Sequence, residues 1–127
     1  MTIKEYQELA MRTNDGLCNS RLLGKGLTYT TDRKENRVNP GELINGALGL
    51  TGEAGEVSDI IKKYIFHRHD LEIEEIVKEL GDVCWYVALL SYAIGVPLEE
   101  ILETNIEKLK KRYPEGFSEE NSINRTE

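Results

Sequence analysis

The sequence has few cysteines, no long apolar run and no convincing strand pattern. The two cysteines, Cys18 and Cys84, lie far apart without the spacing of a metal-binding motif, which favours reduced thiols in a cytosolic protein over a disulfide framework. The longest apolar-rich stretch, residues 83–97, is too short and too interrupted to span a bilayer. Residues 1–13 carry charges where a signal peptide would be apolar, so we expect a cytoplasmic protein without membrane association.

Positive charge is also scarce. The chain has 16 lysines and arginines against 23 aspartates and glutamates, for a formal net charge of −7. A surface that binds nucleic acid polymers needs a basic stripe to neutralise phosphates, and this balance disfavours one. An acidic protein can still bind a phosphorylated small molecule if a divalent cation lies between its carboxylates and the phosphates. The charge balance therefore leaves that class of ligand open.

The elements that are present predict an all-α domain. A length of 127 residues suits one domain with one core. Thr2 and Glu5 form a capping box that begins a helix over residues 3–13. Three further helices are expected over residues 40–67, 71–94 and 97–112, from the following signals. Asn39 and Pro40 begin the helix over residues 40–67. Asp70 caps the helix over residues 71–94, and Gly95 ends it. Pro97 begins the helix over residues 97–112, which stops at the sequence Tyr113-Pro114-Glu115-Gly116.

Two segments lack this regularity. Residues 14–40 have weak apolar periodicity and a local excess of positive charge, and we expect an irregular loop there, with a short helix near residues 20–26. The loop is a candidate lid over a bound ligand, or an ordinary connection that packs on a neighbouring subunit. Residues 118–127 are polar and are expected to form a loose tail. The sequence thus predicts one domain over residues 1–117, a four-to-five-helix bundle, followed by the tail.

Acid pairs recur at the same position on two helices. At about 100° per residue, Glu53 and Glu56 lie at one edge of the apolar face of the helix over residues 40–67. Glu79 and Asp82 lie at the same edge of the apolar face of the next helix. Because the loop between these helices is short, they are expected to be antiparallel neighbours with the acid pairs facing each other.

Four converging carboxylates repel each other unless they take up protons or bind a cation. Hard divalent cations prefer oxygen ligands, and Mg²⁺ or Mn²⁺ suits a site that water and phosphate complete. A single pair of glutamates at this spacing is usually a solvated helix face. The matching phase of two such pairs makes a metal site the competing interpretation.

The two helical segments resemble a known family. The stretches GLTGEAGEVSDIIKKYIF and EEIVKELGDVCWYVALLSYAIGVPLEEILETNIEKLKKRYPEGF are similar to the MazG-like nucleoside triphosphate pyrophosphohydrolases of the all-α NTP pyrophosphatase superfamily. The family signature of ExxE followed by ExxD is matched by residues 53–56 and 79–82. The Asn, Lys and Arg of the family's last helix are matched by Asn105, Lys108 and Arg112. The resemblance covers about residues 43–117.

The resemblance implies a helical bundle completed by assembly into a homodimer or homotetramer. It implies Mg²⁺, or Mn²⁺ as a substitute, bound by Glu53, Glu56, Glu79 and Asp82. The reaction would cleave a nucleoside or deoxynucleoside triphosphate between the α- and β-phosphates, which sanitises or controls the nucleotide pool. Glu53 or Glu56 would also accept a proton from the attacking water. Four further residues are expected to bind substrate: Tyr86, Asn105, Lys108 and Arg112.

Three other interpretations bear on this assignment. A di-iron carboxylate bundle needs Glu-x-x-His, and neither histidine stands three residues after a glutamate. A helical interaction module without catalysis would keep the apolar faces and would not need the acids. A phosphoribosyl-ATP pyrophosphatase belongs to the same superfamily, and the sequence alone leaves it open.

Overall fold

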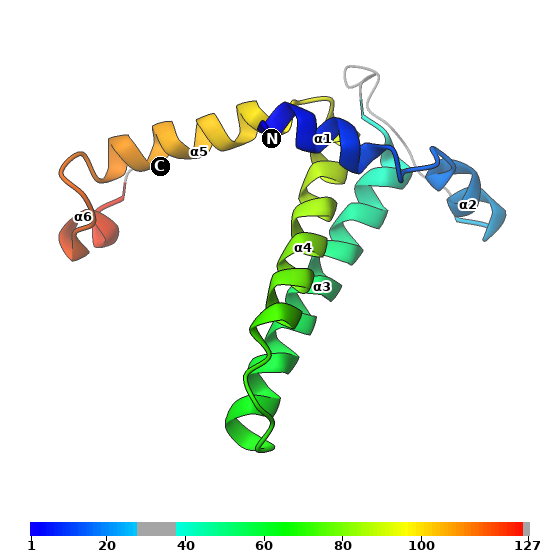
Figure 1. Ribbon diagram of the computed structural model, residues 1–127. Coiled ribbons are helices and arrows are strands. Elements are labelled where there is room, and N and C mark those ends of the chain that lie inside the picture. The colour runs from blue at the N-terminus through cyan, green and yellow to red at the C-terminus, as the bar shows by residue number, and fades with distance from the viewer. Residues whose placement is uncertain (28–37, 126–127) are drawn as a thin grey trace.

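The computed structural model describes residues 1–27 and 38–125, which contain six helices and no strand. It confirms the expected all-α class. Figure 1 shows a long antiparallel hairpin of two helices, with shorter helices at its open end and one long helix that leaves that end sideways. The helices are α1 (Ile3–Met11), α2 (Cys18–Gly24), α3 (Pro40–Phe66), α4 (Ile73–Ile94), α5 (Leu98–Arg112) and α6 (Glu119–Ile123).

Most of the predicted helix boundaries are confirmed. The Glu5 N–H donates to Thr2 Oγ1 at 3.1 Å and the Thr2 N–H donates to Glu5 Oε2 at 2.6 Å, which completes the capping box of α1. Gly95 ends α4 with φ at 68°, a left-handed conformation that glycine adopts without strain. The cap at Asp70 is wrong, because α4 begins at Ile73 after Glu72 and has no side-chain cap.

The two irregular segments contain short helices. The helix expected near residues 20–26 is present as α2, shifted towards the N-terminus. Part of the candidate lid, residues 28–37, lies outside the described residues. In the polar tail, the Ser118 side chain accepts a hydrogen bond from the Asn121 N–H at 3.0 Å and begins α6.

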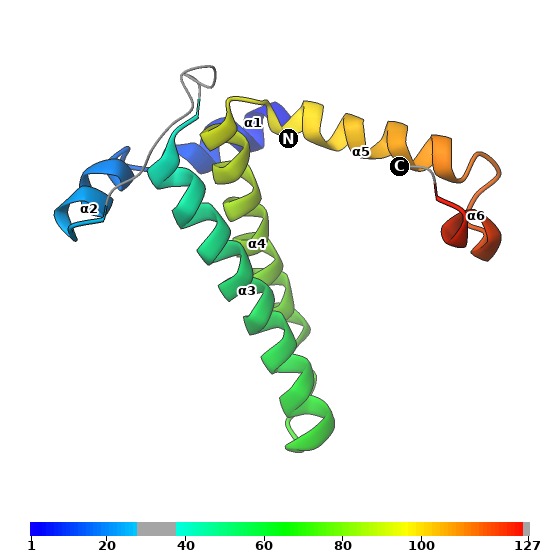
Figure 2. The same ribbon diagram turned by 180° about the vertical axis from the view of Figure 1, so that it is seen from behind.

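Two glycines explain how α3 and α4 approach closely, as both views show (Figures 1 and 2). A Cβ atom at Gly46 would lie 2.7 Å from the Leu90 side chain, and one at Gly49 would overlap the ring of Tyr86. Side chains of α4 therefore occupy the space that a larger residue would need at these two positions. Gly52 and Gly55 face open space within the chain.

A small core joins α1, α4 and α5. Ala10, Ala88 and Leu98 are its buried members. Trp85 packs beside them, and its Nε1–H donates to Ala10 O at 3.0 Å and to Thr13 Oγ1 at 2.7 Å. Trp85 therefore ties α4 to α1 within one chain. Few other apolar side chains are buried among the described residues, and large apolar side chains along the hairpin, such as Leu48, Ile61 and Val77, are exposed.

The α5 helix turns sharply away from α4. The pair is bent by 100° at the break between Ile94 and Leu98. Among the described residues no single helix is both long and apolar enough to cross a membrane, and α4 with α5 meet that length and composition test only as this bent pair. The far half of α5 consequently lies well away from the hairpin (Figure 1).

Candidate metal and nucleotide site

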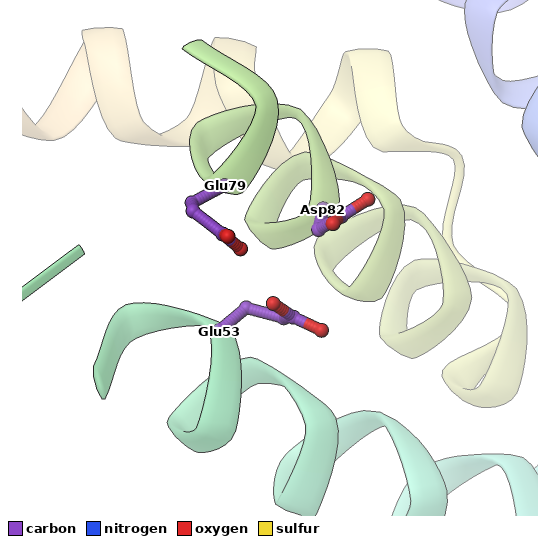
Figure 3. A group of neighbouring side chains, drawn as sticks. All are labelled: Glu53, Glu79 and Asp82. Carbon is purple, nitrogen blue, oxygen red and sulfur yellow. The ribbon is translucent and has the colours of Figure 1, made fainter. Parts of the chain in front are cut away.

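Three carboxylates converge between α3 and α4. Glu53 on α3 points across the hairpin to Glu79 on α4, and Asp82 lies one turn further along α4 (Figure 3). One carboxylate oxygen from each lies within 4.8 Å of the others. Glu53 and Glu79 are half-buried and Asp82 is exposed, so the group opens to solvent on one side. We call these three residues the acid cluster.

Glu56 lies beside the acid cluster and does not join it. Its side chain is exposed, and the described residues that could share one ion are Glu53, Glu79 and Asp82. Its charge still reaches the cluster, because the pKa of Glu79 is raised by partial burial, by a hydrogen bond with Glu53, and by repulsion from Glu53, Glu56 and Asp82. Negative charge is thus concentrated at the acid cluster.

The acid cluster has the size that a divalent ion requires. Octahedral Mg²⁺ binds oxygens at about 2.0–2.1 Å, which places its ligands about 2.9 Å apart on neighbouring positions and about 4.1 Å apart on opposite ones. Three carboxylate oxygens within 4.8 Å of each other need to move by at most about 1 Å each to occupy three neighbouring positions. Three carboxylates also supply the hard oxygen donors that Mg²⁺ and Mn²⁺ prefer. The acid cluster can therefore bind a metal.

The lysines near the acid cluster pair with other acids. Lys63 Nζ lies 2.7 Å from a carboxylate oxygen of Asp59, and Lys62 pairs with the same residue at 3.2 Å. Lys78 Nζ lies 2.6 Å from Glu75 Oε1. Their closest partners lie outside the acid cluster, although the charge of Glu79 also raises the pKa of Lys78 and the charge of Glu56 raises that of Lys63.

Tyr86 lies one turn beyond Asp82 on α4, as expected. Its ring is half-buried against the backbone of α3 at Gly49 and meets the ring of Trp85 edge-on, with 5.0 Å between ring centroids. The ring therefore helps to set the spacing between α3 and α4 next to the acid cluster. Its substrate contact stays a prediction.

The remaining expected substrate residues lie on α5 and are not brought to the acid cluster by their own chain. Asn105 and Lys108 are exposed, and Arg112 is half-buried with its guanidinium 5.8 Å from the centroid of the Tyr113 ring. They occupy the half of α5 that points away from the hairpin (Figures 1 and 2).

The burial of the Glu42 carboxylate was not predicted from the sequence. Glu42, in the first turn of α3, is 3% exposed, and its Oε2 has no hydrogen-bond partner among the described residues. It lies near Cys18 of α2, where burial and then the charge of Glu42 raise the pKa of the thiol. No helical pattern signals this burial, because it depends on how α2 packs on α3.

Comparison with known proteins agrees with this geometry. Residues 44–117, more than half of the chain, match the model of the MazG nucleotide pyrophosphohydrolase domain. The chain belongs to the MazG family. The matched segment contains the acid cluster, Tyr86 and all of α5. Membership of the MazG family indicates a nucleotide substrate and pyrophosphohydrolase chemistry.

Two curated relatives of this MazG chain have names that state no activity. Gene 37 protein of Mycobacterium phage L5 is 35% identical over 82 residues, which cover 61% of this chain and 72% of the relative. Uncharacterized protein YvdC of Bacillus subtilis strain 168 is 32% identical over 73 residues, which cover 50% of this chain and 69% of the relative. No solved structure matches the chain significantly.

Proposed function

We propose that the protein is a Mg²⁺-dependent pyrophosphohydrolase of nucleoside or deoxynucleoside triphosphates. The observation that carries this proposal is the acid cluster, where Glu53, Glu79 and Asp82 offer three oxygens within 4.8 Å inside the family-matched segment. The products would be a nucleoside monophosphate and pyrophosphate. A cytoplasmic location and a role in nucleotide-pool sanitation or control are part of the proposal.

The reaction requires little covalent chemistry from the protein. Water adds to one of the two phosphorus atoms that flank the α–β bridging oxygen, the bond from that phosphorus to the bridging oxygen breaks, and one proton is released. Mg²⁺ or Mn²⁺ bound at the acid cluster would neutralise phosphate charge and polarise the reacting phosphoryl oxygens. Glu53 and Glu56 are the two candidates to accept the proton from water, and Glu56 has the more accessible carboxylate.

The test is product analysis with a panel of ribo- and deoxynucleoside triphosphates, with Mg²⁺, with Mn²⁺ and with chelator. We expect metal-dependent release of monophosphate and pyrophosphate by the native chain. Glu53→Gln should abolish it. The matched control is Glu74→Gln, an exposed acid on α4 outside the acid cluster, which should keep native activity.

Three results would contradict the proposal. Release of inorganic phosphate would place cleavage at a different bond, and turnover in chelator would remove the metal from the mechanism. Absence of turnover with every triphosphate would favour a non-catalytic interaction module or a phosphoribosyl-ATP pyrophosphatase, and phosphoribosyl-ATP would be tested next.

A further inference from the structure

The carboxylate of Glu42 is a buried acceptor with an unpaired oxygen. The residue is 3% exposed, and its Oε2 has no hydrogen-bond partner among the described residues. Glu42 stands three residues after Asn39, where the glutamate of a capping box would accept the N–H of the N-cap residue. The Asn39 N–H instead donates to Ala93 O at 2.8 Å. Because a buried polar group without a partner is costly, Oε2 favours a ligand that brings a hydrogen-bond donor.

Glu42 lies where α2 packs on the first turn of α3. Asn19 Oδ1 accepts a hydrogen bond from the Gly41 N–H at 2.6 Å, which holds α2 against the start of α3. Burial, and then the charge of Glu42, raise the pKa of the Cys18 thiol, and Asn45 Nδ2 lies 3.7 Å from Cys18 Sγ. The carboxylate of Glu42 and the amide of Asn45 therefore meet at the same thiol. Because no residue of α2 is buried, a shift of this short helix costs little packing.

Glu42 and the acid cluster share one face of α3. Glu42 is eleven residues before Glu53, which corresponds to about 16 Å along the helix and to a difference in phase of about 20°. Asn45 stands in the same relation to Glu56, and Gly52 lies within about 40° of both in phase. A Cβ atom at Gly52 would meet nothing within 4 Å. An open strip of α3 thus leads from the acid cluster to Asn45, next to Glu42.

A nucleoside triphosphate has the length that joins the acid cluster to Glu42. With covalent bonds of about 1.3–1.5 Å, an extended nucleotide spans roughly 10 Å from its α-phosphorus to the amino group of its base. A metal–oxygen contact of about 2 Å and a hydrogen bond of about 3 Å lengthen this reach. The total is comparable with the distance of about 16 Å between Glu53 and Glu42 along α3. A triphosphate held by metal at the acid cluster can therefore bring its base to Glu42.

An ionised carboxylate only accepts hydrogen bonds, and this property selects among bases. Cytosine and adenine carry an amino group, which donates, whereas uracil, thymine and hypoxanthine carry a carbonyl oxygen at the same position. The amino group would donate to Glu42, and the second N–H of the Asn45 amide would donate to the adjacent ring nitrogen. A carbonyl oxygen at that position would face a carboxylate that offers it no donor.

We propose that Glu42 determines base specificity by accepting a hydrogen bond from the amino group of the substrate base, after a shift of α2 that admits the base. This rests on the proposed function. The preferred substrates are then triphosphates of cytosine and adenine, and those of uracil and hypoxanthine are disfavoured. Such selectivity spares deaminated nucleotides, so it favours control of the nucleotide pool over sanitation as the role of the protein.

Binding of non-hydrolysable triphosphates tests the proposal without turnover. The probes are the α,β-methylene analogues of dCTP and dUTP, and those of dATP and dITP, titrated by calorimetry in Mg²⁺. Within each pair the bases differ by the exchange of an amino group for a carbonyl oxygen. A hydrogen bond to a charged group is equivalent to about tenfold to hundredfold in affinity, so the native chain should bind the amino member tighter by that factor. Glu42→Gln should bring the two members within about threefold, because glutamine both donates and accepts.

Two further variants separate base recognition from a structural role of Glu42. Glu42→Asp keeps the charge on a shorter side chain and should retain a preference for the amino member. Glu74→Gln, an exposed acid on α4, is the matched control and should keep the native ratio of affinities. If Glu42 only stabilised the fold, Glu42→Gln would lower the Tm and weaken both members of a pair equally.

The possible results also distinguish this proposal from the proposed function. Equal affinity of the native chain for the two members of each pair, or an unchanged ratio in Glu42→Gln, would overturn the assignment of Glu42 and leave the proposed function standing. Failure of the native chain to bind any of the four analogues would overturn both. A preference for the amino members that is lost in Glu42→Gln and kept in Glu74→Gln would support the assignment.

Discussion

Gln7 on α1 connects three helices, and its replacement by methionine should be costly. Its Nε2 donates to Ser91 Oγ at 2.9 Å and to Ala88 O at 3.5 Å. Its Oε1 accepts a hydrogen bond from the Leu98 N–H at 3.0 Å. The first four N–H groups of a helix have no partner inside that helix, so the first N–H of α5 depends on Gln7. The residue therefore helps to fix the direction in which α5 leaves α4.

The expected cost of Gln7→Met follows from these contacts. Each of the two shorter hydrogen bonds contributes about 1 kcal/mol, and a buried donor left unpaired adds about 1 kcal/mol or more. Leu98 is buried, so its N–H has little access to water after the change. We expect the free energy of unfolding to fall by about 2–3 kcal/mol, or roughly 10 °C in Tm for a domain of this size.

Thermal and urea denaturation at one fixed protein concentration measure this effect, because oligomer stability depends on concentration. Glu8→Gln is the matched control: it is the next residue on α1, exposed, and should change the free energy of unfolding by less than about 0.5 kcal/mol. A Tm of Gln7→Met within about 2 °C of native would refute the idea that Gln7 joins α1, α4 and α5.

Three further predictions concern the α3–α4 hairpin. Gly49→Ala should lower the urea midpoint despite the better helix propensity of alanine, because its Cβ would overlap the Tyr86 ring, whereas Gly52→Ala meets nothing within its chain and should raise it. In chelator, the raised pKa of Glu79 means that the folded state binds the carboxyl proton more tightly than the unfolded state does. The resulting stabilisation is present below the unfolded pKa of 4.5 and is lost as pH rises through the raised folded pKa. The difference in free energy of unfolding between native and Glu79→Gln should therefore change in that pH window and level off on either side. Mg²⁺ at about one hundred times its Kd should stabilise the native chain by about 2.7 kcal/mol, close to 10 °C in Tm, and should not stabilise Glu79→Gln; equal shifts in both proteins would place the metal elsewhere.

Local signals in the sequence were sufficient for much of the fold. The capping box at Thr2 and the left-handed Gly95 depend on a few neighbouring residues, and both are confirmed. The facing of Glu53 and Glu79 follows from helical phase and a short loop, and the structure confirms it. Each of these features depends on residue spacing within one or two helices, and that spacing can be read directly from the sequence.

Features set by packing between helices were not predictable. Whether the two acid pairs lie opposite each other depends on the relative position of α3 and α4 along their axes. In the structure this position leaves Glu56 outside the acid cluster. The start of α4 at Ile73 instead of near Asp70 also depends on the hairpin connection. At the 100° bend between α4 and α5, the Leu98 N–H donates to Gln7, which is more than ninety residues away along the chain. No pattern within α5 itself signals that direction.

The central claim is that the acid cluster binds the divalent metal that the reaction needs. Titration of Mn²⁺ into the native protein, Glu79→Gln and Glu74→Gln, followed by electron paramagnetic resonance of free Mn²⁺, tests it without turnover. The account predicts equal affinity for native and Glu74→Gln, and a loss of at least about tenfold for Glu79→Gln, since even changes to groups behind metal ligands cost that much. Equal affinity in all three proteins would contradict it.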